Sequence, residues 1–152
     1  MIVAIARGTL IVSLWFGAVS AIGGGLLGVL TNGAGVPVSY LEHSPFSSYL
    51  VPGLLLGVVI GGTQCAAAIL LSRRQRCGLT AAAVAGLGMI VWIFAELAII
   101  SEYSPLQVVY LALGIGELTL ILFTLGLLTP FLRPLRPSVP ATAIRPWMPE
   151  EL

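Results

Sequence analysis

The fold is decided around LLSRRQRCGL, residues 70–79, where three arginines interrupt two long apolar runs. The run before this stretch covers about residues 49–71, and the run after it covers about residues 79–100. Because a helix rises 1.5 Å per residue and a bilayer core is about 30 Å thick, each run is long enough to cross a membrane. The stretch therefore predicts two transmembrane helices joined by a short charged turn.

Two further apolar runs, at about residues 9–30 and 108–129, complete the pattern. Hydrophobic residues make up 58% of the chain and charged residues only 9%, whereas soluble domains carry about 25% charged residues. We therefore predict an all-α integral membrane protein, an up-and-down bundle of four transmembrane helices within residues 1–130. A tail rich in proline and arginine follows over residues 131–152, and its prolines exclude a continuous helix.

The first run could also be a signal peptide, since Val19-Ser20-Ala21 could pass as a cleavage site. However, the run is longer than a signal core and continues past that site. We therefore expect a membrane anchor that is retained.

Orientation follows from the basic residues, all seven of which are arginines. They are Arg7, Arg73, Arg74, Arg76, Arg133, Arg136 and Arg145. With four spans, all of them fall on one side of the membrane, whereas Glu42 and Glu102 fall on the other. The positive-inside rule then predicts cytoplasmic termini in a bacterial inner membrane. The four tyrosines lie at the opposite boundary, as an interfacial aromatic belt would: Tyr40, Tyr49, Tyr103 and Tyr110.

Small residues indicate where helices approach closely, because helix association in lipid depends on tight backbone contact. The second run carries the stripe Gly53, Gly57 and Gly61. Further candidate packing glycines are Gly24, Gly28 and Gly114. These faces could pack within the bundle or form an interface with another subunit.

Connections between the runs give further expectations. Ser44-Pro45 predicts a helix start before the second run, and Pro130 predicts the end of the fourth helix. The connection between the first two runs is long for a helix bundle, which points to a function on that side.

Three polar residues fall inside the apolar runs: Gln64, Glu96 and Glu117. Because helical side chains lean toward their own N-terminus, the two carboxyls are expected to converge if both face the bundle. They would form a neutral hydrogen-bonded pair, a proton or cation site with Glu42, His43 and Glu102 above it, or a contact to a partner. Gln64 is expected to bond a neighbouring helix. Trp92 and Tyr110 are expected to wall the space between the third and fourth helices.

The sequence gives little support for a metal site, a cofactor, a thiol-linked enzyme or a nucleic-acid partner. One histidine and scattered carboxylates lack the spacing of a zinc site, so no metal and no cofactor are expected. Cys65 and Cys77 do not form a C-x-x-C pair, which disfavours a thiol-linked enzyme. A net charge of +1 gives no indication of a nucleic-acid partner.

Three segments resemble a known group of proteins: SPFSSYLVPGLLLG at residues 44–57, WIFAELAII at residues 92–100 and SPLQVVYLALG at residues 104–114. They are similar to small, mostly uncharacterised four-span membrane proteins of high-GC bacteria. Those proteins share an S-P-F-S-x-Y-x-x-P-G-L junction and a glutamate near the end of the third span. The resemblance implies the same fold and supplies no activity, and Glu117 lies outside its pattern.

The sequence favours a small non-catalytic protein, an accessory or structural subunit of a larger membrane complex. Its expected partners are the lipid bilayer and other membrane subunits or further copies of itself. The alternative is a small proton- or cation-coupled transporter or channel that uses Glu96 and Glu117. Small four-span multidrug exporters carry their essential glutamate in the first span, where this chain has none.

Overall fold

The computed structural model describes residues 2–42, 44–100 and 103–128, and these residues form helices and no strand. The helices are α1 (Ile2–Leu30), the short 3₁₀ helix η1 (Val38–Leu41), α2 (Leu50–Leu54), the π-helical η2 (Leu55–Ile60), α3 (Gly61–Ser72), α4 (Gly78–Ile99) and α5 (Pro105–Thr124). Elements α2, η2 and α3 form one continuous rod. Four helices are thus long and apolar enough to cross a membrane, which confirms the predicted all-α fold.

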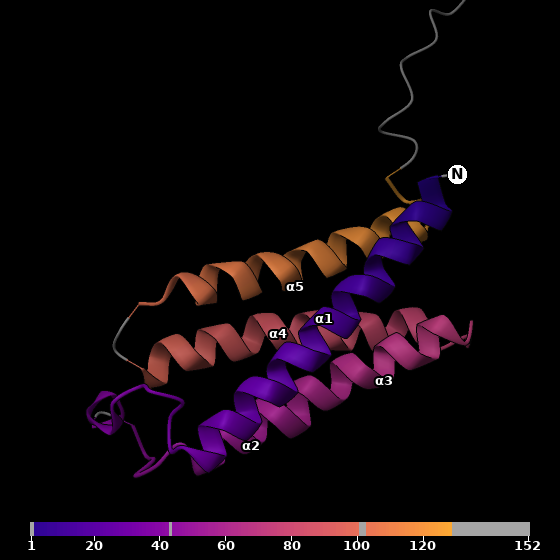
Figure 1. The fold of residues 1–152 in the computed structure, drawn as a ribbon. Coiled ribbons are helices and arrows are strands. Elements are labelled where there is room, and N and C mark those ends of the chain that lie inside the picture. Colours follow the sequence, from indigo (N-terminus) through magenta and orange to yellow (C-terminus); the bar gives the residue numbers. More distant parts are fainter. Residues whose placement is uncertain (1, 43, 101–102, 129–152) are drawn as a thin grey trace, which may run out of the picture.

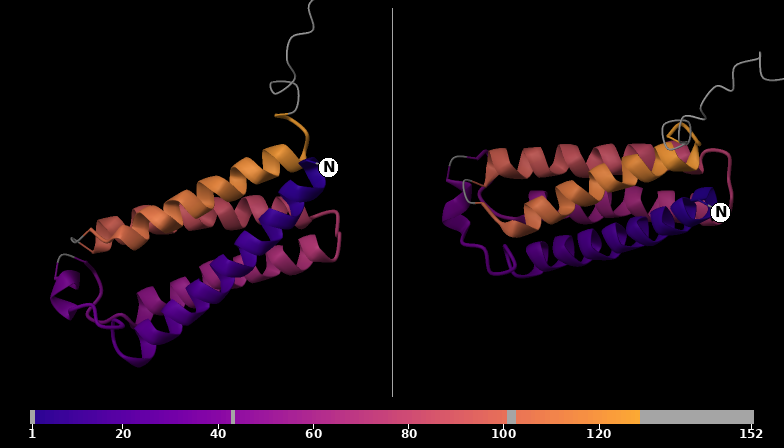
Figure 2. Two further views of the ribbon diagram at one scale, coloured as in Figure 1. Left: turned by 45° about the horizontal axis from the view of Figure 1, so that its top comes forward. Right: turned by 90° about the horizontal axis from the view of Figure 1, so that it is seen from above.

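The four spans form a closed bundle (Figures 1 and 2). Each span packs against the next in the chain, and α5 returns to pack against α1. The end that carries the turn after α3, with Arg73, Arg74 and Arg76, is named the arginine end. The opposite end, which carries the long connection of residues 31–49, is named the loop end.

The first helix begins at Ile2 rather than near residue 9, and it therefore contains Arg7. The Arg7 Nη2 donates a hydrogen bond of 2.6 Å to the Leu71 carbonyl oxygen near the end of α3. Carbonyls in the last turn of a helix have no partner within it and carry the negative pole of its dipole, so a guanidinium is stabilised there. This contact holds the start of α1 at the arginine end.

The fourth span begins at Pro105 rather than near residue 108, because the chain forms a capping box there. The Leu106 N–H donates to Ser104 Oγ at 3.3 Å, and the Ser104 N–H donates to Gln107 Oε1 at 3.0 Å. Pro105 takes the first helical position, where its missing N–H costs nothing.

The same helix ends at Thr124 rather than near residue 129. Gly126 follows with a φ of 73°, and the Leu127 N–H donates to the Leu122 carbonyl oxygen at 3.1 Å. This is a Schellman motif, in which glycine adopts a left-handed conformation that ends the helix. The prediction that Pro130 ends this helix is therefore wrong.

The predicted helix start at Ser44-Pro45 is also wrong, because the rod begins at Leu50. Ser44 Oγ instead donates to the Leu41 carbonyl oxygen at 2.9 Å and accepts from the Phe46 N–H at 3.2 Å. Serine side chains often form such local turns in place of a helix cap.

Tyr49 departs from the predicted interfacial belt. Its side chain is only 6% exposed, and its hydroxyl donates to the Pro37 carbonyl oxygen at 3.1 Å. Its backbone N–H donates to Asn32 Oδ1 at 3.0 Å. Tyr49 therefore holds the long connection against the bundle, whereas Tyr103, which is 69% exposed, fits the predicted belt.

The closest approach between helices is made by glycines of α1 and of the rod. A Cβ added at Gly25 would lie 2.5 Å from both the Gly53 carbonyl oxygen and the Gly57 nitrogen. A Cβ added at Gly61 would lie 2.6 Å from Ile22 Cγ1. The predicted glycine stripe of the second span therefore packs against α1 of the same chain.

The other candidate glycines also pack inside the bundle. A Cβ at Gly24 would lie 3.5 Å from Leu56 Cδ2, and one at Gly28 would lie 3.7 Å from Gly53 Cα. A Cβ at Gly114 would lie 3.0 Å from the Gly86 carbonyl oxygen, which places these two positions of α5 and α4 at the same level.

The core differs between the two ends of the bundle. Toward the arginine end, small and branched side chains fill the space among all four spans: Leu10, Leu14, Ala67, Ala68, Leu71, Ala82, Ala85 and Ile121. Toward the loop end, a second cluster forms around Ala21, Ile60 and Met89, with Trp92 and Tyr110 packed against it. The predicted position of Trp92 and Tyr110 between α4 and α5 is thereby confirmed.

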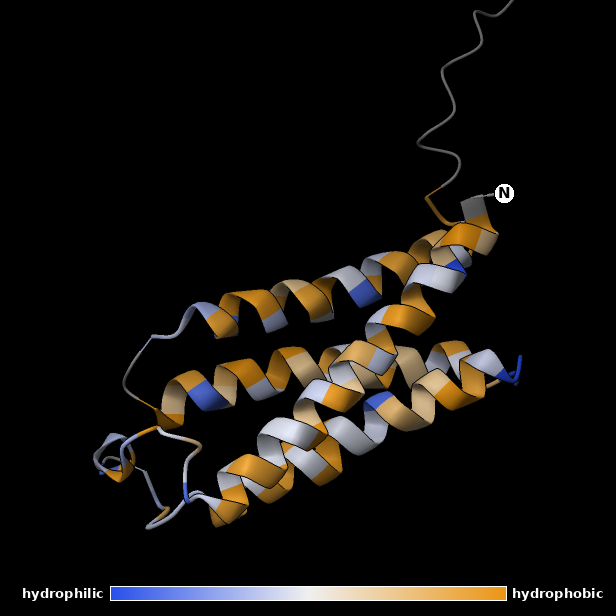
Figure 3. Cartoon of the chain, in the orientation of Figure 1, coloured by the Kyte–Doolittle hydropathy of each residue, from blue (hydrophilic) through white to orange (hydrophobic). Residues whose placement is uncertain are grey.

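The outward surface of the bundle is apolar, as lipid requires. Hydrophobic positions dominate the long helices, and hydrophilic ones gather at the turn after α3 and in the loops (Figure 3). Large exposed side chains occur on every span, among them Val19, Val58, Phe94 and Ile115. The protein is therefore a multi-pass membrane protein in contact with lipid.

Candidate functional site

Glu96 lies on α4, close to the loop end, and faces α5. Its Oε1 accepts a hydrogen bond of 3.4 Å from Gln107 Nε2. Gln107 is 3% exposed, and its own Oε1 is held by the backbone N–H of Ser104 in the capping box of α5. The fold of the helix start thus fixes the amide so that its NH₂ group points at the carboxyl.

Trp92 lies one helical turn before Glu96, on the same face of α4. The indole Nε1 is buried and lies beside the Glu96 carboxyl, although among the described residues it makes no hydrogen bond of good geometry. A buried indole N–H usually finds an acceptor. The indole N–H and the Glu96 carboxyl therefore lie together in the same space, as a donor beside an acidic acceptor.

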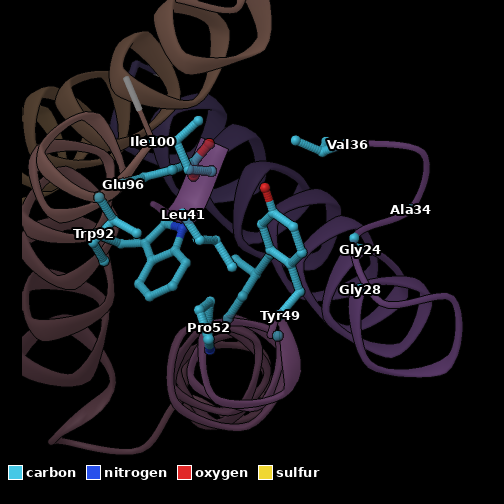
Figure 4. A pocket seen from close by; sticks show the side chains of 14 residues that line it. Gly24, Gly28, Ala34, Val36, Leu41, Tyr49, Pro52, Trp92, Glu96 and Ile100 are labelled. Atoms are coloured by element: carbon cyan, nitrogen blue, oxygen red, sulfur yellow. The ribbon is translucent and has the colours of Figure 1, made fainter. Parts of the chain in front are cut away.

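Two cavities, named the loop-end cavities, adjoin this pair. The first, of about 140 Å³, lies beneath the connection of residues 31–49 and is bordered by Leu41, Tyr49 and Pro52 (Figure 4). The second, of about 200 Å³, lies among α1, α4 and α5 and is bordered by Ser20, Met89 and Tyr110.

Four residues line both loop-end cavities: Gly24, Leu56, Trp92 and Glu96. Leu56 belongs to η2, where the backbone is in the wider π-helical form. Such segments are frequent at functional sites, because the extra residue in the turn displaces the neighbouring side chains. Glu96 and Trp92 therefore stand at the boundary between two spaces rather than in a packed core.

A second polar site lies deeper in the bundle and joins α3 to α5. Gln64 Nε2 donates a hydrogen bond of 2.9 Å to Glu117 Oε2, and both side chains have an exposed fraction of 0%. The remaining oxygens, Gln64 Oε1 and Glu117 Oε1, have no hydrogen-bond partner in the described part of the chain. Two buried acceptor oxygens are thus left without a donor. Of the two side chains, only the Glu117 carboxyl can bind an additional proton, which would make it a hydrogen-bond donor.

Glycines of the other two helices make room for this buried pair. A Cβ at Gly17 of α1 would lie 3.0 Å from both Cδ and Oε1 of Gln64. A Cβ at Gly86 of α4 would lie 3.4 Å from Glu117 Cβ. All four spans therefore meet at the Gln64–Glu117 pair.

The predicted convergence of Glu96 and Glu117 is wrong. Glu117 lies level with Gly86, and Glu96 lies ten residues farther along α4, which corresponds to about 15 Å. Each carboxyl has its own amide partner, Gln107 for Glu96 and Gln64 for Glu117. The expectation that Gln64 bonds a neighbouring helix is confirmed, and its partner is the other carboxyl.

The remaining predicted residues do not add to either site. Glu42 is exposed and closes η1 at the loop end. His43 and Glu102 lie outside the described residues, as does the tail. Among the residues that the structure describes, no group of three histidine, cysteine or acidic side chains could hold a metal ion. Cys65 and Cys77 are free thiols.

Gln107 belongs to the candidate site, whereas sequence reasoning noted it only as part of the segment SPLQVVYLALG. The signal was present, because Ser104 followed three residues later by a glutamine before an apolar run is the pattern of a capping box. Gly17, Ala21 and Gly25 repeat at four-residue spacing, as do Ala82 and Gly86, but this pattern does not show which neighbouring helix each glycine contacts.

Comparison with protein-family models, with curated proteins and with solved structures gives no match for this chain. The resemblance to small bacterial four-span proteins therefore stays a prediction, as does the cytoplasmic placement of the termini.

Proposed function

We propose that this protein is a small transporter that couples to protons or cations through Glu96 and Glu117. The observation that supports it most directly is the position of Glu96, an acidic side chain inside a span that borders two cavities. Its hydrogen-bond partner there is the uncharged amide of Gln107. Ionisable residues within membrane spans are costly, and they commonly mark ion and proton pathways.

A transporter fits the arrangement better than an open channel. Between the level of Glu96 and that of Glu117 lie Met89, Ile93 and Tyr110, and Met89 and Ile93 are buried. Neither Gln64 nor Glu117 lines a loop-end cavity, so these cavities do not join the two carboxyls. Movement of a proton or cation past this level therefore requires a rearrangement of the helices, as in alternating access.

A role as an accessory subunit is our second candidate. The sequence suggested it because of its glycine faces, but Gly53, Gly57 and Gly61 contact α1 of the same chain. Exposed apolar side chains are expected wherever a helix contacts lipid and wherever it contacts a partner protein. Their presence therefore gives no support to a subunit interface over a lipid contact.

Proton flux into liposomes tests the first candidate. Purified protein is reconstituted with a pH-sensitive dye trapped inside, and a potassium diffusion potential is imposed. We expect acidification with the native protein and its loss in Glu96→Gln and Glu117→Gln, whose amides keep the shape of the carboxyls. Gly62→Ala is the matched control, because nothing lies within 4 Å of a Cβ at that position.

Flux equal to that of empty liposomes, with protons and with small monovalent cations in turn, would contradict the transporter proposal. Affinity purification in mild detergent then tests the second candidate. A larger membrane complex that co-purifies in stoichiometric amount would support the accessory role, and isolation of the chain alone would contradict it.

A further inference from the structure

The loop-end cavities combine one acidic group with aromatic and apolar walls. Tyr49 borders the first cavity, Tyr110 borders the second, and Trp92 borders both together with Glu96. Figure 4 shows the side chains of Trp92, Glu96 and Tyr49 around the first cavity. Apart from Glu96, Gln107 and Ser20, the described side chains that line the two cavities are apolar or aromatic.

Among the residues that the structure describes, no basic side chain balances Glu96 in this space. None of the described residues that line the cavities is an arginine, and the described arginines lie at the arginine end or, for Arg7, on the Leu71 carbonyl oxygen. An ionised carboxyl in apolar surroundings is strongly stabilised by a nearby positive charge, because water screens it poorly there. Since no described residue supplies this charge, a proton or a cationic ligand can supply it.

We propose that the loop-end cavities bind a small organic ammonium ion with its charged group at Glu96. The inference rests on the function proposed above and names its substrate class. Tyrosine and tryptophan rings attract ammonium groups through their negative faces, most strongly where water is excluded. The apolar walls suit the hydrocarbon part of such a molecule.

Other ligand classes fit this space less well. A metal ion requires several oxygen or nitrogen ligands, whereas the described polar side chains that line the cavities, apart from the aromatic ones, are those of Glu96, Gln107 and Ser20. An anion would be repelled by Glu96. A purely apolar molecule would displace water from Glu96 and supply no positive charge to balance an ionised carboxyl.

Binding of benzyltrimethylammonium tests the inference. Its neutral isostere, neopentylbenzene, has the same shape with a carbon atom in place of the charged nitrogen. Trp92 is made the sole tryptophan by the changes Trp15→Phe and Trp147→Phe, and its fluorescence is followed in detergent as each compound is added. We expect saturable binding of the cation that is at least about ten-fold tighter than binding of the isostere.

Glu96→Gln in this background should reduce the affinity for the cation by about ten-fold or more and leave binding of the isostere unchanged. Gly62→Ala serves as the control and should bind both compounds as the parent does. Equal affinity for the two compounds, or no saturable binding of either, would overturn the inference. The comparison of the two compounds on the parent protein needs no variant, so it holds even where Glu96→Gln folds poorly.

The flux assay separates this inference from the proposed function. Proton flux without binding of the cation would overturn the substrate class and leave the transporter proposal standing. Binding of the cation that depends on Glu96, without flux of any ion, would support the site and contradict transport.

Discussion

Replacing Gly25 by alanine adds one methyl group at the closest contact between α1 and the rod. The new Cβ would lie 2.5 Å from the Gly53 carbonyl oxygen, 2.5 Å from the Gly57 nitrogen and 2.6 Å from the Gly57 Cα. Carbon atoms in contact sit about 3.5–4.0 Å apart. Since all three contacts are with backbone, no side chain can turn away, and the two helices must separate by about 1 Å.

The expected cost follows from two opposing effects. Overpacking a well-packed contact destabilises by about 1–3 kcal/mol, and wider helix spacing also weakens the other contacts of this face. Alanine in place of glycine stabilises a helix by up to about 1 kcal/mol. Gly23→Ala isolates the second effect, because nothing lies within 4 Å of a Cβ at that position of the same helix.

The free energy of unfolding is measured for both variants by titration with sodium dodecyl sulfate from mixed micelles, followed by circular dichroism. We expect Gly23→Ala to be as stable as the native protein or slightly more so. Gly25→Ala should be less stable than Gly23→Ala by about 2 kcal/mol. Equal stability of the two variants would show that α1 and the rod are not in backbone contact at this level, and the close packing described above would be refuted.

Three further predictions concern the buried pair, the cap of α5 and the orientation. Glu117→Leu should lower the free energy of unfolding by about 1–3 kcal/mol, because the Gln64 amide is left without a partner, whereas Glu117→Gln should keep most of the stability. Equal losses in detergent unfolding would contradict a specific hydrogen bond. Ser104→Ala should cost about 1 kcal/mol through loss of the cap, and an unchanged unfolding midpoint would count against it. Cys77, which is exposed, should react with a membrane-impermeant maleimide in inside-out vesicles and not in intact cells when Cys65 is replaced by alanine. Labelling of Cys77 in intact cells would reverse the orientation.

The spans could be predicted from the sequence because bilayer thickness dictates the length of each apolar run. In three of the four spans, the helix contains the apolar run predicted from the sequence to within one residue. The largest errors lie at the start of α1 and at the two ends of α5. Those ends depend on polar contacts rather than on hydropathy. Arg7 lies within α1 because the Leu71 carbonyl oxygen accepts its hydrogen bond, and α5 stops early because Gly126 takes a left-handed conformation.

The error about the two carboxyls has a definite origin. Glu96 lies three residues before the end of α4, whereas Glu117 lies twelve residues after Pro105, the start of α5. The difference of nine residues corresponds to about 13 Å of depth, which side-chain lean cannot overcome. The predicted start of the fourth span near residue 108 made this difference look smaller by about 4–5 Å. An accurate reading of the Ser104 capping box would have corrected it.

The partner of Glu117 could not be predicted in the same way. Periodicity shows which residues share one face of a helix, but it does not show how that face is rotated toward the other helices. The hydrogen bond between Gln64 and Glu117 joins two spans that are not adjacent in the chain, and Gly17 and Gly86 of the other two spans leave room for it. Single-sequence patterns carry no direct record of such contacts.

Gln107 connects the fold to the proposed chemistry. Its Oε1 caps α5 by accepting the Ser104 N–H, and its Nε2 donates to Glu96. Because its oxygen is fixed in the helix cap, the Gln107 amide directs its NH₂ group at Glu96, and both the ionised and the protonated carboxyl can accept that hydrogen bond. Any change at Glu96 that breaks this bond, such as pairing with an ammonium ion, would leave the Gln107 NH₂ group free while the cap stays intact. The loop end can therefore exchange partners at Glu96 without unfolding the start of α5, whereas the tightly packed arginine end has no comparable freedom.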